Sequence, residues 1–194
     1  MDNKFFTFAR PYLSFIDKGH LFKKPFNWLY TVMAIINLLV PLIILFTSID
    51  NGVFKLKFKV VLTFILIWLI TAFASWISFQ IWWDRRSKIT YSTQENDEFV
   101  ATPAFSHFIQ TAGETYGTWI GLVGFGFALF TTIILGGEAS YLSYQLGMPL
   151  GSLMGSGVAA IFIMPIIGFL IIILSRFVSE QIKALVAIAN NTKK

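Results

Sequence analysis

The chain has 194 residues, of which 56% are hydrophobic and only 13% are charged. An ordinary soluble domain carries about 25% charged residues, and a soluble core of this size cannot bury so much apolar surface. The absence of cysteine excludes disulfides, thiolate metal sites and cysteine nucleophiles. The net charge of +5 is scattered between apolar segments, so we expect an α-helical membrane protein and no nucleic-acid partner.

The first half of the chain contains two windows long enough to cross a bilayer, which needs about 20 largely apolar residues. Residues 1–25 precede them and mix aromatic with basic side chains, which is typical of a cytoplasmic segment lying at the membrane surface. The first window covers residues 26–49, and the second covers residues 58–83. The run Trp82–Arg86 then places an aromatic pair before charged residues, which indicates the end of a membrane span.

Two further windows, residues 115–135 and 150–174, complete a predicted all-α bundle of four transmembrane helices. The pair Thr102–Pro103 is a typical helix start, so the third helix is expected to begin in the cytoplasm before its membrane-embedded part. No helix breaker follows the fourth window, so we expect that helix to extend into a cytoplasmic tail at residues 179–194. The transmembrane domain as a whole is expected to cover residues 26–178.

The distribution of basic residues predicts the orientation of the spans. Twelve of the 15 lysines and arginines fall before the first span, between the second and third, or after the fourth. The other three, Lys55, Lys57 and Lys59, lie on the opposite side. Because basic residues concentrate on the cytoplasmic side of a membrane, we expect both termini in the cytoplasm. The composition is typical of a multi-pass protein of the bacterial inner membrane.

Two rows of glycine residues recur at every third or fourth position. The row in the third helix comprises Gly113, Gly117, Gly121 and Gly124, and the row around the start of the fourth comprises Gly147, Gly151 and Gly155. Small residues at this spacing allow helix backbones to approach closely in lipid. The simplest interpretation is that the two rows pack against each other within one chain, and the alternative is self-association through one of them.

Glu114 is the strongest candidate for a binding residue, with His107 and Tyr116 on nearby turns of the same helix. Ionisable residues inside a membrane are costly and are usually functional. Because the third window begins at residue 115, Glu114 can lie among the lipid headgroups, where water reaches it. The alternative is a buried carboxylate that binds a proton or a cation and pairs with Arg85 or Arg86.

The end of the fourth helix places Arg176 four residues before Glu180, a spacing that allows an ion pair on one helix face. Together with the apolar run that ends in Asn190 and Asn191, these residues resemble the ending of a family of small bacterial membrane proteins. In that family an arginine and a glutamate close the last transmembrane helix. The resemblance is confined to residues 176–191 and implies no activity.

No pattern in the sequence indicates a metal site, a cofactor or a catalytic centre. His20 and His107 each lack a second ligand at metal-binding spacing. The glycines lie inside apolar helices rather than in a phosphate-binding loop, and no serine stands in a nucleophile elbow. We therefore expect neither a metal nor a cofactor, and an enzyme is the least favoured class.

Two hypotheses of function remain. The first is a non-enzymatic accessory or scaffold subunit that forms a homo-oligomer or binds a membrane-protein partner, because packing features dominate the sequence. The second is a small transporter or channel that works as an oligomer, with Glu114 near its cytoplasmic entrance. Inverted repeats often mark transporters. The two halves of the chain show no similarity to each other, so the second hypothesis is less favoured than the first.

Overall fold

The computed structural model describes residues 20–92, 101–136 and 157–192, and these parts of the chain contain helices and no strands. The helices are α2 (His20–Asp50), α3 (Phe58–Ser92), α4 (Ala101–Phe130) and α6 (Val158–Thr192). All four are long and apolar enough to cross a membrane. The predicted all-α four-helix bundle is thus confirmed. Helices suit a membrane because each helix satisfies its own backbone hydrogen bonds, which lipid cannot do.

The helices extend beyond the predicted spans where polar residues continue them. α3 continues to Ser92 and α4 begins at Ala101, close to the predicted start at Pro103. α6 reaches Thr192, in agreement with the expected helical tail, and its described part begins at Val158. The N-terminal surface segment up to residue 19 and the glycines Gly147, Gly151 and Gly155 lie outside the described residues.

The helix ends near the α2–α3 connection and at the end of α4 depart from regular α-helix. A short 3₁₀ helix, η1 (Val53–Lys55), links α2 to α3, and Gly52 before it has a φ of 70°, which favours glycine. The last turn of α4 widens into a π-helix, η2 (Thr131–Leu135). The Thr131 hydroxyl donates to the Phe127 carbonyl oxygen at 2.6 Å, so a side chain takes over part of the backbone bonding at this turn.

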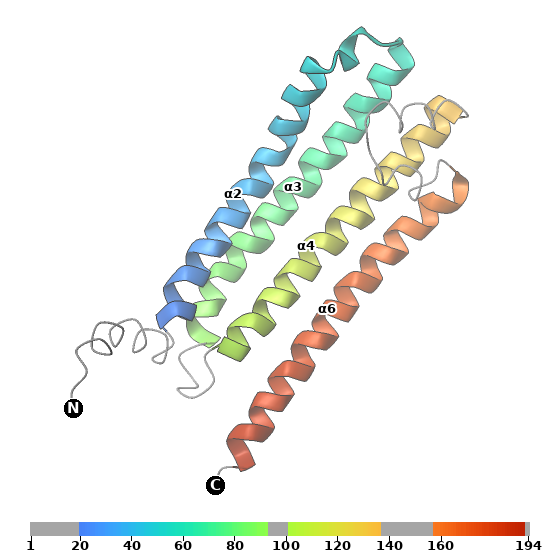
Figure 1. Ribbon diagram of the computed structural model, residues 1–194. Helices are drawn as coiled ribbons and strands as arrows, with labels where there is room; N and C mark the ends of the chain where they lie inside the picture. Colours follow the sequence, from blue (N-terminus) through green and yellow to red (C-terminus); the bar gives the residue numbers. More distant parts are fainter. Residues whose placement is uncertain (1–19, 93–100, 137–156, 193–194) are drawn as a thin grey trace, which may run out of the picture.

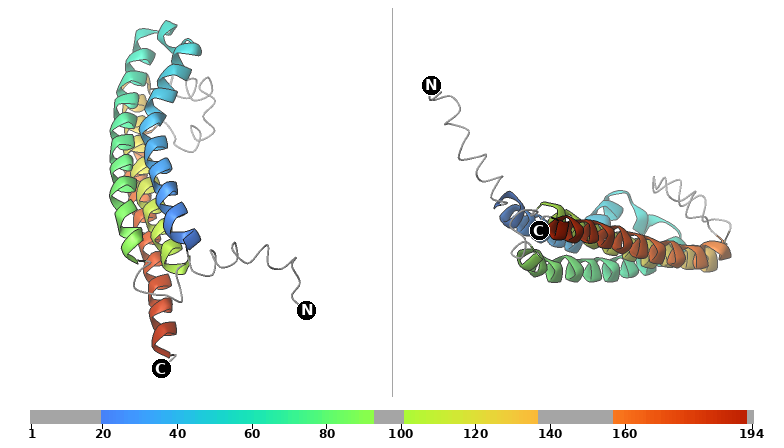
Figure 2. Two further views of the ribbon diagram at one scale, coloured as in Figure 1. Left: turned by 90° about the vertical axis from the view of Figure 1, so that its left-hand side faces the viewer. Right: turned by 90° about the horizontal axis from the view of Figure 1, so that it is seen from below.

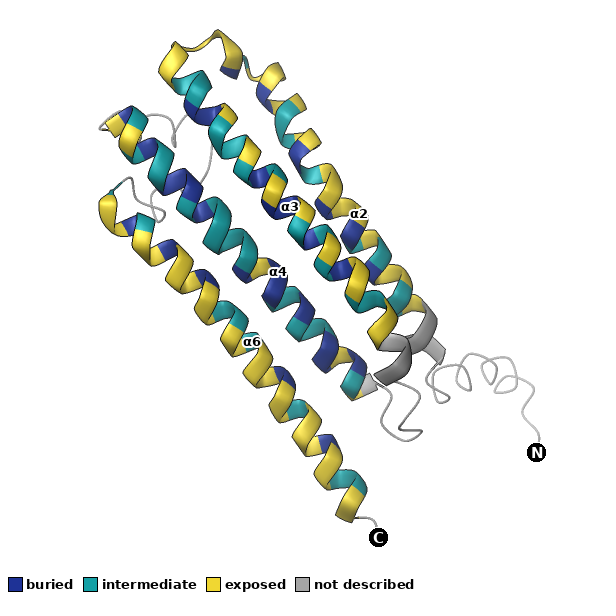
Figure 3. Ribbon diagram, turned by 180° about the vertical axis from the view of Figure 1, so that it is seen from behind, coloured by how far each residue is buried: buried dark blue, intermediate teal, exposed yellow. Residues whose placement is uncertain are grey.

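The four helices form an open layer in which the order in space is α2, α3, α4, α6 (Figure 1). Figure 2 shows the same helices close to edge-on, where they overlap in a thin slab. The most extensive contact joins α4 to α6, and α3 packs against both α2 and α4. α4 is accordingly the most buried of the four spans and α2 and α6 the least, so the two outer helices form the edges of the layer (Figure 3).

Aromatic packing fills the space between α2, α3 and α4. Tyr30 of α2 and Trp82 of α3 are almost fully buried, and their rings meet edge to face with centroids 4.8 Å apart. Phe108 of α4 packs against both, at 6.3 and 5.8 Å. Such pairs add stability beyond the burial of area, and here they connect three helices near one end of the layer.

Glycine allows α4 and α6 to meet backbone to backbone. A Cβ atom built on Gly168 of α6 would lie 2.7 Å from the Cα of Gly121 and would overlap the carbonyl oxygen of Gly117. One at Gly113 would overlap Ser175. Gly124 is also buried. Gly113, Gly117 and Gly121 of the predicted α4 row thus face α6. The α6 residues that they meet, Gly168 and Ser175, belong to neither of the two predicted rows.

We expect Gly168→Ala to destabilise the protein by about 1–3 kcal/mol, because the added methyl group meets rigid backbone rather than a movable side chain. Gly157→Ala is the matched control, since a Cβ there has nothing within 4 Å. The measurement is unfolding of the detergent-solubilised protein by sodium dodecyl sulfate, followed by circular dichroism. Equal stabilities of the two variants would contradict the backbone contact described here.

Candidate functional site

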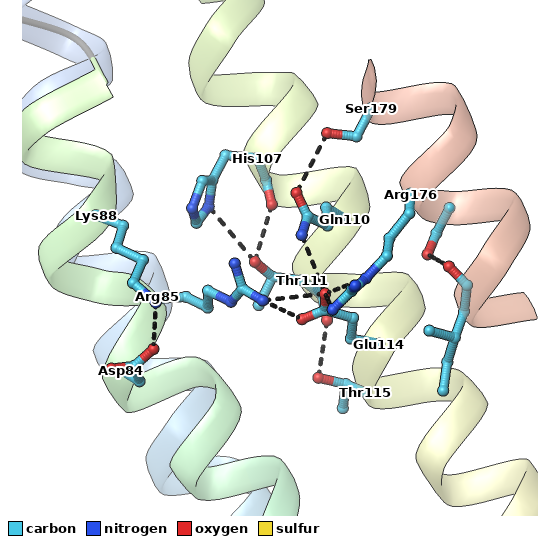
Figure 4. Close-up of polar contacts among 12 residues, drawn as sticks. Asp84, Arg85, Lys88, His107, Gln110, Thr111, Glu114, Thr115, Arg176 and Ser179 are labelled. Atoms are coloured by element: carbon cyan, nitrogen blue, oxygen red, sulfur yellow. Dashed lines mark hydrogen bonds and ion pairs between the residues drawn. The ribbon is translucent and has the colours of Figure 1, made fainter. Parts of the chain in front are cut away.

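Glu114 lies at the centre of a charged cluster in which α3, α4 and α6 meet (Figure 4). Its carboxylate is almost fully buried, with 8% of the side chain exposed. Arg85 of α3 donates from Nη2 to both carboxylate oxygens, at 3.0 and 2.9 Å. Arg176 of α6 donates from Nε to Oε1 at 2.9 Å, and Gln110 donates to the same oxygen at 3.0 Å. We call Arg85, Gln110, Glu114 and Arg176 the Glu114 cluster.

The helices position each member of the Glu114 cluster in a simple way. Gln110 and Glu114 are one turn apart on α4, so their side chains share a face. The contact between Gly113 and Ser175 brings the backbones of α4 and α6 together beside the cluster. At this separation of the two helices, the extended side chain of Arg176 is long enough to reach the Glu114 carboxylate.

The charges of the Glu114 cluster do not balance. Two guanidinium groups, which stay protonated in proteins, face one carboxylate. Their exposure differs, because 21% of the Arg85 side chain is accessible but 54% of the Arg176 side chain. Separating a buried carboxylate from its cations costs more than either bond contributes, because the remaining charge has no other partner. The cluster can therefore hold three helices together and still present positive charge on the side where Arg176 is exposed.

The structure shows which of the two arginines, Arg85 or Arg86, pairs with Glu114. Arg85 is the one of the two expected partners that contacts Glu114. Arg86 donates instead to the Thr31 hydroxyl at 3.4 Å and lies 4.2 Å over the Trp83 ring.

The expected ion pair between Arg176 and Glu180 is wrong in the structure, where Arg176 pairs with Glu114. Glu180 is exposed, so water solvates it. The buried carboxylate has far more to gain from a guanidinium group.

His107 belongs to a second polar network, which joins α2 to α4. The Tyr30 hydroxyl lies 3.1 Å from His107 Nδ1 and 3.4 Å from Thr111 Oγ1. Thr111 also donates to the His107 carbonyl oxygen at 2.8 Å. All three residues are buried, which requires such mutual hydrogen bonding. Spacing in the sequence does not connect Tyr30 with His107, because 77 residues separate them.

Tyr116 stands apart from both networks. It is exposed and lines an apolar groove of about 470 Å³ between α2 and α4, together with Trp82 and Trp119. The Trp119 indole nitrogen donates to Asn37 Oδ1 of α2 at 3.3 Å. The three predicted binding residues therefore fall in three different surroundings rather than one site.

A hydroxyl pair on α4 and α6 was also missed by the sequence reasoning. Ser106 donates to the Ser179 carbonyl oxygen at 2.8 Å, and the two hydroxyl oxygens lie 2.8 Å apart. One turn away, Lys183 contacts the side-chain oxygen of Gln110 at 3.4 Å. Among the described residues, no three histidines, aspartates or glutamates gather where they could hold a metal ion.

We expect Glu114→Gln to destabilise the protein by about 3 kcal/mol, because the change leaves two guanidinium groups without their carboxylate. Asp84→Asn is the control, since Asp84 is exposed and pairs only with exposed Lys88. That change should leave the free energy of unfolding nearly unchanged, because water solvates both partners of this pair. Both are measured by the same detergent titration. A Glu114→Gln variant as stable as Asp84→Asn would show that the cluster does not hold the helices.

Comparison with known proteins returned no matching family model, no matching curated protein and no matching solved structure. The resemblance of residues 176–191 to a family of bacterial membrane proteins therefore gains no support. What can be said of function rests on the geometry of the layer and of its two polar networks.

Proposed function

We propose that this protein is a non-enzymatic subunit of the bacterial inner membrane that acts by association, as an accessory protein or as a homo-oligomer. The observation that carries the proposal is the unclosed edge of the layer at α6. α6 packs against α4 and leaves a straight row of apolar side chains exposed on its outer side. The row consists of Ile163, Ile166, Leu170, Ile173 and Phe177. We call it the α6 row.

The spacing of the α6 row suits a neighbouring helix. Its members alternate between three and four residues apart, which is the spacing of a seam between two helices that cross at a shallow angle. The helix also continues past the starts of α2 and α4 (Figure 1), where it exposes Leu185 and Ile188. Exposed apolar side chains past the ends of the neighbouring helices favour a protein partner over lipid.

The positive-inside distribution supports an orientation for this subunit. The Glu114 cluster lies toward the end of the layer where α3 ends at Ser92 and α4 begins at Ala101, and most of the basic residues belong to that side. We place this side in the cytoplasm, with both termini. The α6 extension then projects from the membrane into the cytoplasm, where a partner reaches it.

Transport is the second hypothesis and has less support. It requires Glu114 to exchange a proton or a cation along a path. The carboxylate instead accepts hydrogen bonds from Arg85, Arg176 and Gln110, and the guanidinium groups already compensate its charge. The geometry is that of a helix connection rather than of an open ion-binding site.

The proposal is tested by disulfide cross-linking, which is clean because the chain has no native cysteine. We expect Leu170→Cys, in the α6 row, to give a discrete cross-linked dimer when native membranes are oxidised. Phe73→Cys is the control, because Phe73 is also exposed but lies on α3, away from the α6 edge. Native mass spectrometry in mild detergent identifies the alternative, a complex with another membrane protein.

Two results would contradict association through α6. One is equal cross-linking of Leu170→Cys and Phe73→Cys, which indicates random collision. The other is a protein that stays monomeric in mild detergent, binds no partner from its own membrane and gives no cross-link at Leu170→Cys.

A further inference from the structure

A second apolar groove, of about 530 Å³, lies between α3 and α6 with α4 as its floor. Its side chains come from Ile77 of α3, from Thr118, Leu122 and Phe125 of α4, and from Phe169 and Ile172 of α6. Gly117, Gly121 and Gly168 border it along the edge where the backbones of α4 and α6 meet. We call this space the α3–α6 groove.

The α3–α6 groove leads directly to the Glu114 cluster. On α4, Thr118 of the groove lies one turn from Glu114, and on α6, Ile172 lies one turn from Arg176. Arg85 follows Ile77 by about two turns of α3. Figure 4 shows Arg85 and Arg176 reaching toward each other over Glu114 from the two flanking helices. An apolar channel thus ends at a pair of guanidinium groups.

The charge at this end of the α3–α6 groove is complementary to a phosphate. Two arginines exceed the single carboxylate by one positive charge, and Lys183 adds another within 3.4 Å of Gln110. A guanidinium group has five N–H donors, and the bonds to Glu114 use one nitrogen of Arg85 and two of Arg176. The remaining donors, above all on half-exposed Arg176, can bond phosphate oxygens, for which arginine is well suited.

We propose that the α3–α6 groove binds an anionic phospholipid of the surrounding membrane. One acyl chain lies along the α4 floor, over Thr118, Leu122 and Phe125, and the headgroup phosphate accepts hydrogen bonds from Arg176 and Arg85. Twenty-one residues of helix, roughly 30 Å, separate Glu114 from Leu135 at the other end of its span, which is about the thickness of the hydrocarbon core, so the cluster reaches the depth of the lipid headgroups. The site goes beyond the proposed association, since the α6 row lies on the other side of that helix.

The experiment is a native mass spectrometry titration of the full-length protein in mild detergent. The probes are phosphatidylglycerol and phosphatidylcholine with identical acyl chains. We expect the wild-type protein to bind phosphatidylglycerol about tenfold more tightly, and Arg176→Gln to abolish most of that preference. Arg86→Gln is the matched control, because it removes the same charge from a residue that faces Thr31 and Trp83 instead. It should leave the preference unchanged.

A second variant tests the acyl chain separately. Thr118→Phe fills the α3–α6 groove and removes no hydrogen bond of the arginines, since the Thr118 hydroxyl donates to the Glu114 carbonyl oxygen of its own helix. We expect it to weaken binding of both lipids, whereas excess inorganic phosphate displaces neither. Circular dichroism and unfolding by dodecyl sulfate establish that each variant is folded.

Three results would overturn the lipid site. They are equal affinity of the wild-type protein for the two lipids, equal loss of preference in Arg176→Gln and Arg86→Gln, and displacement of the lipid by inorganic phosphate together with unchanged binding in Thr118→Phe. The last would show a phosphate site without an acyl-chain groove.

Discussion

The contact between the backbones of α4 and α6 is the constraint on which the rest of the structure depends. In lipid, apolar side chains gain little by leaving one apolar surrounding for another, so helices associate through close packing and polar bonds. Gly117, Gly121 and Gly168 remove the side chains that would hold the two axes apart. The hydroxyls of Ser106 and Ser179 then reach each other, and Arg176 reaches Glu114. The short distance between the axes of α4 and α6 is therefore what allows these polar contacts.

α4 is the helix through which the others are connected, and it uses a different chemistry on each side. Toward α6 it presents glycine and serine, and toward α2 it presents His107 and Thr111, which meet the Tyr30 hydroxyl. Bulky aromatic rings rather than small residues fill the space on the α2 side. The layer is thus tightly joined near the Glu114 cluster, and its two edges are left for lipid or for other proteins.

The sequence predicts the four helices well because hydropathy is a sum over a whole window and tolerates local exceptions. The glycines of α4 form a repeat that can be seen in the sequence, but Gly168, which they contact, is a single residue with no repeat to reveal it. The partner of Arg176 was missed for a physical reason. Local spacing favours exposed Glu180, but a buried carboxylate on another helix binds the guanidinium group more strongly. Local spacing along one helix does not show which side chains of another helix it will meet.

The order of contacts along the layer has a consequence for how such a chain enters a membrane. Neighbours in space are also neighbours in sequence: α2 packs against α3, α3 against α4, and α4 against α6. Each helix can therefore find its partner as soon as the next one is inserted, without waiting for the chain to be complete. Two helix pairs, α2–α3 and α4–α6, can therefore form as separate units before the contact between α3 and α4 completes the layer. Assembly by hairpins needs no rearrangement of spans already in the bilayer.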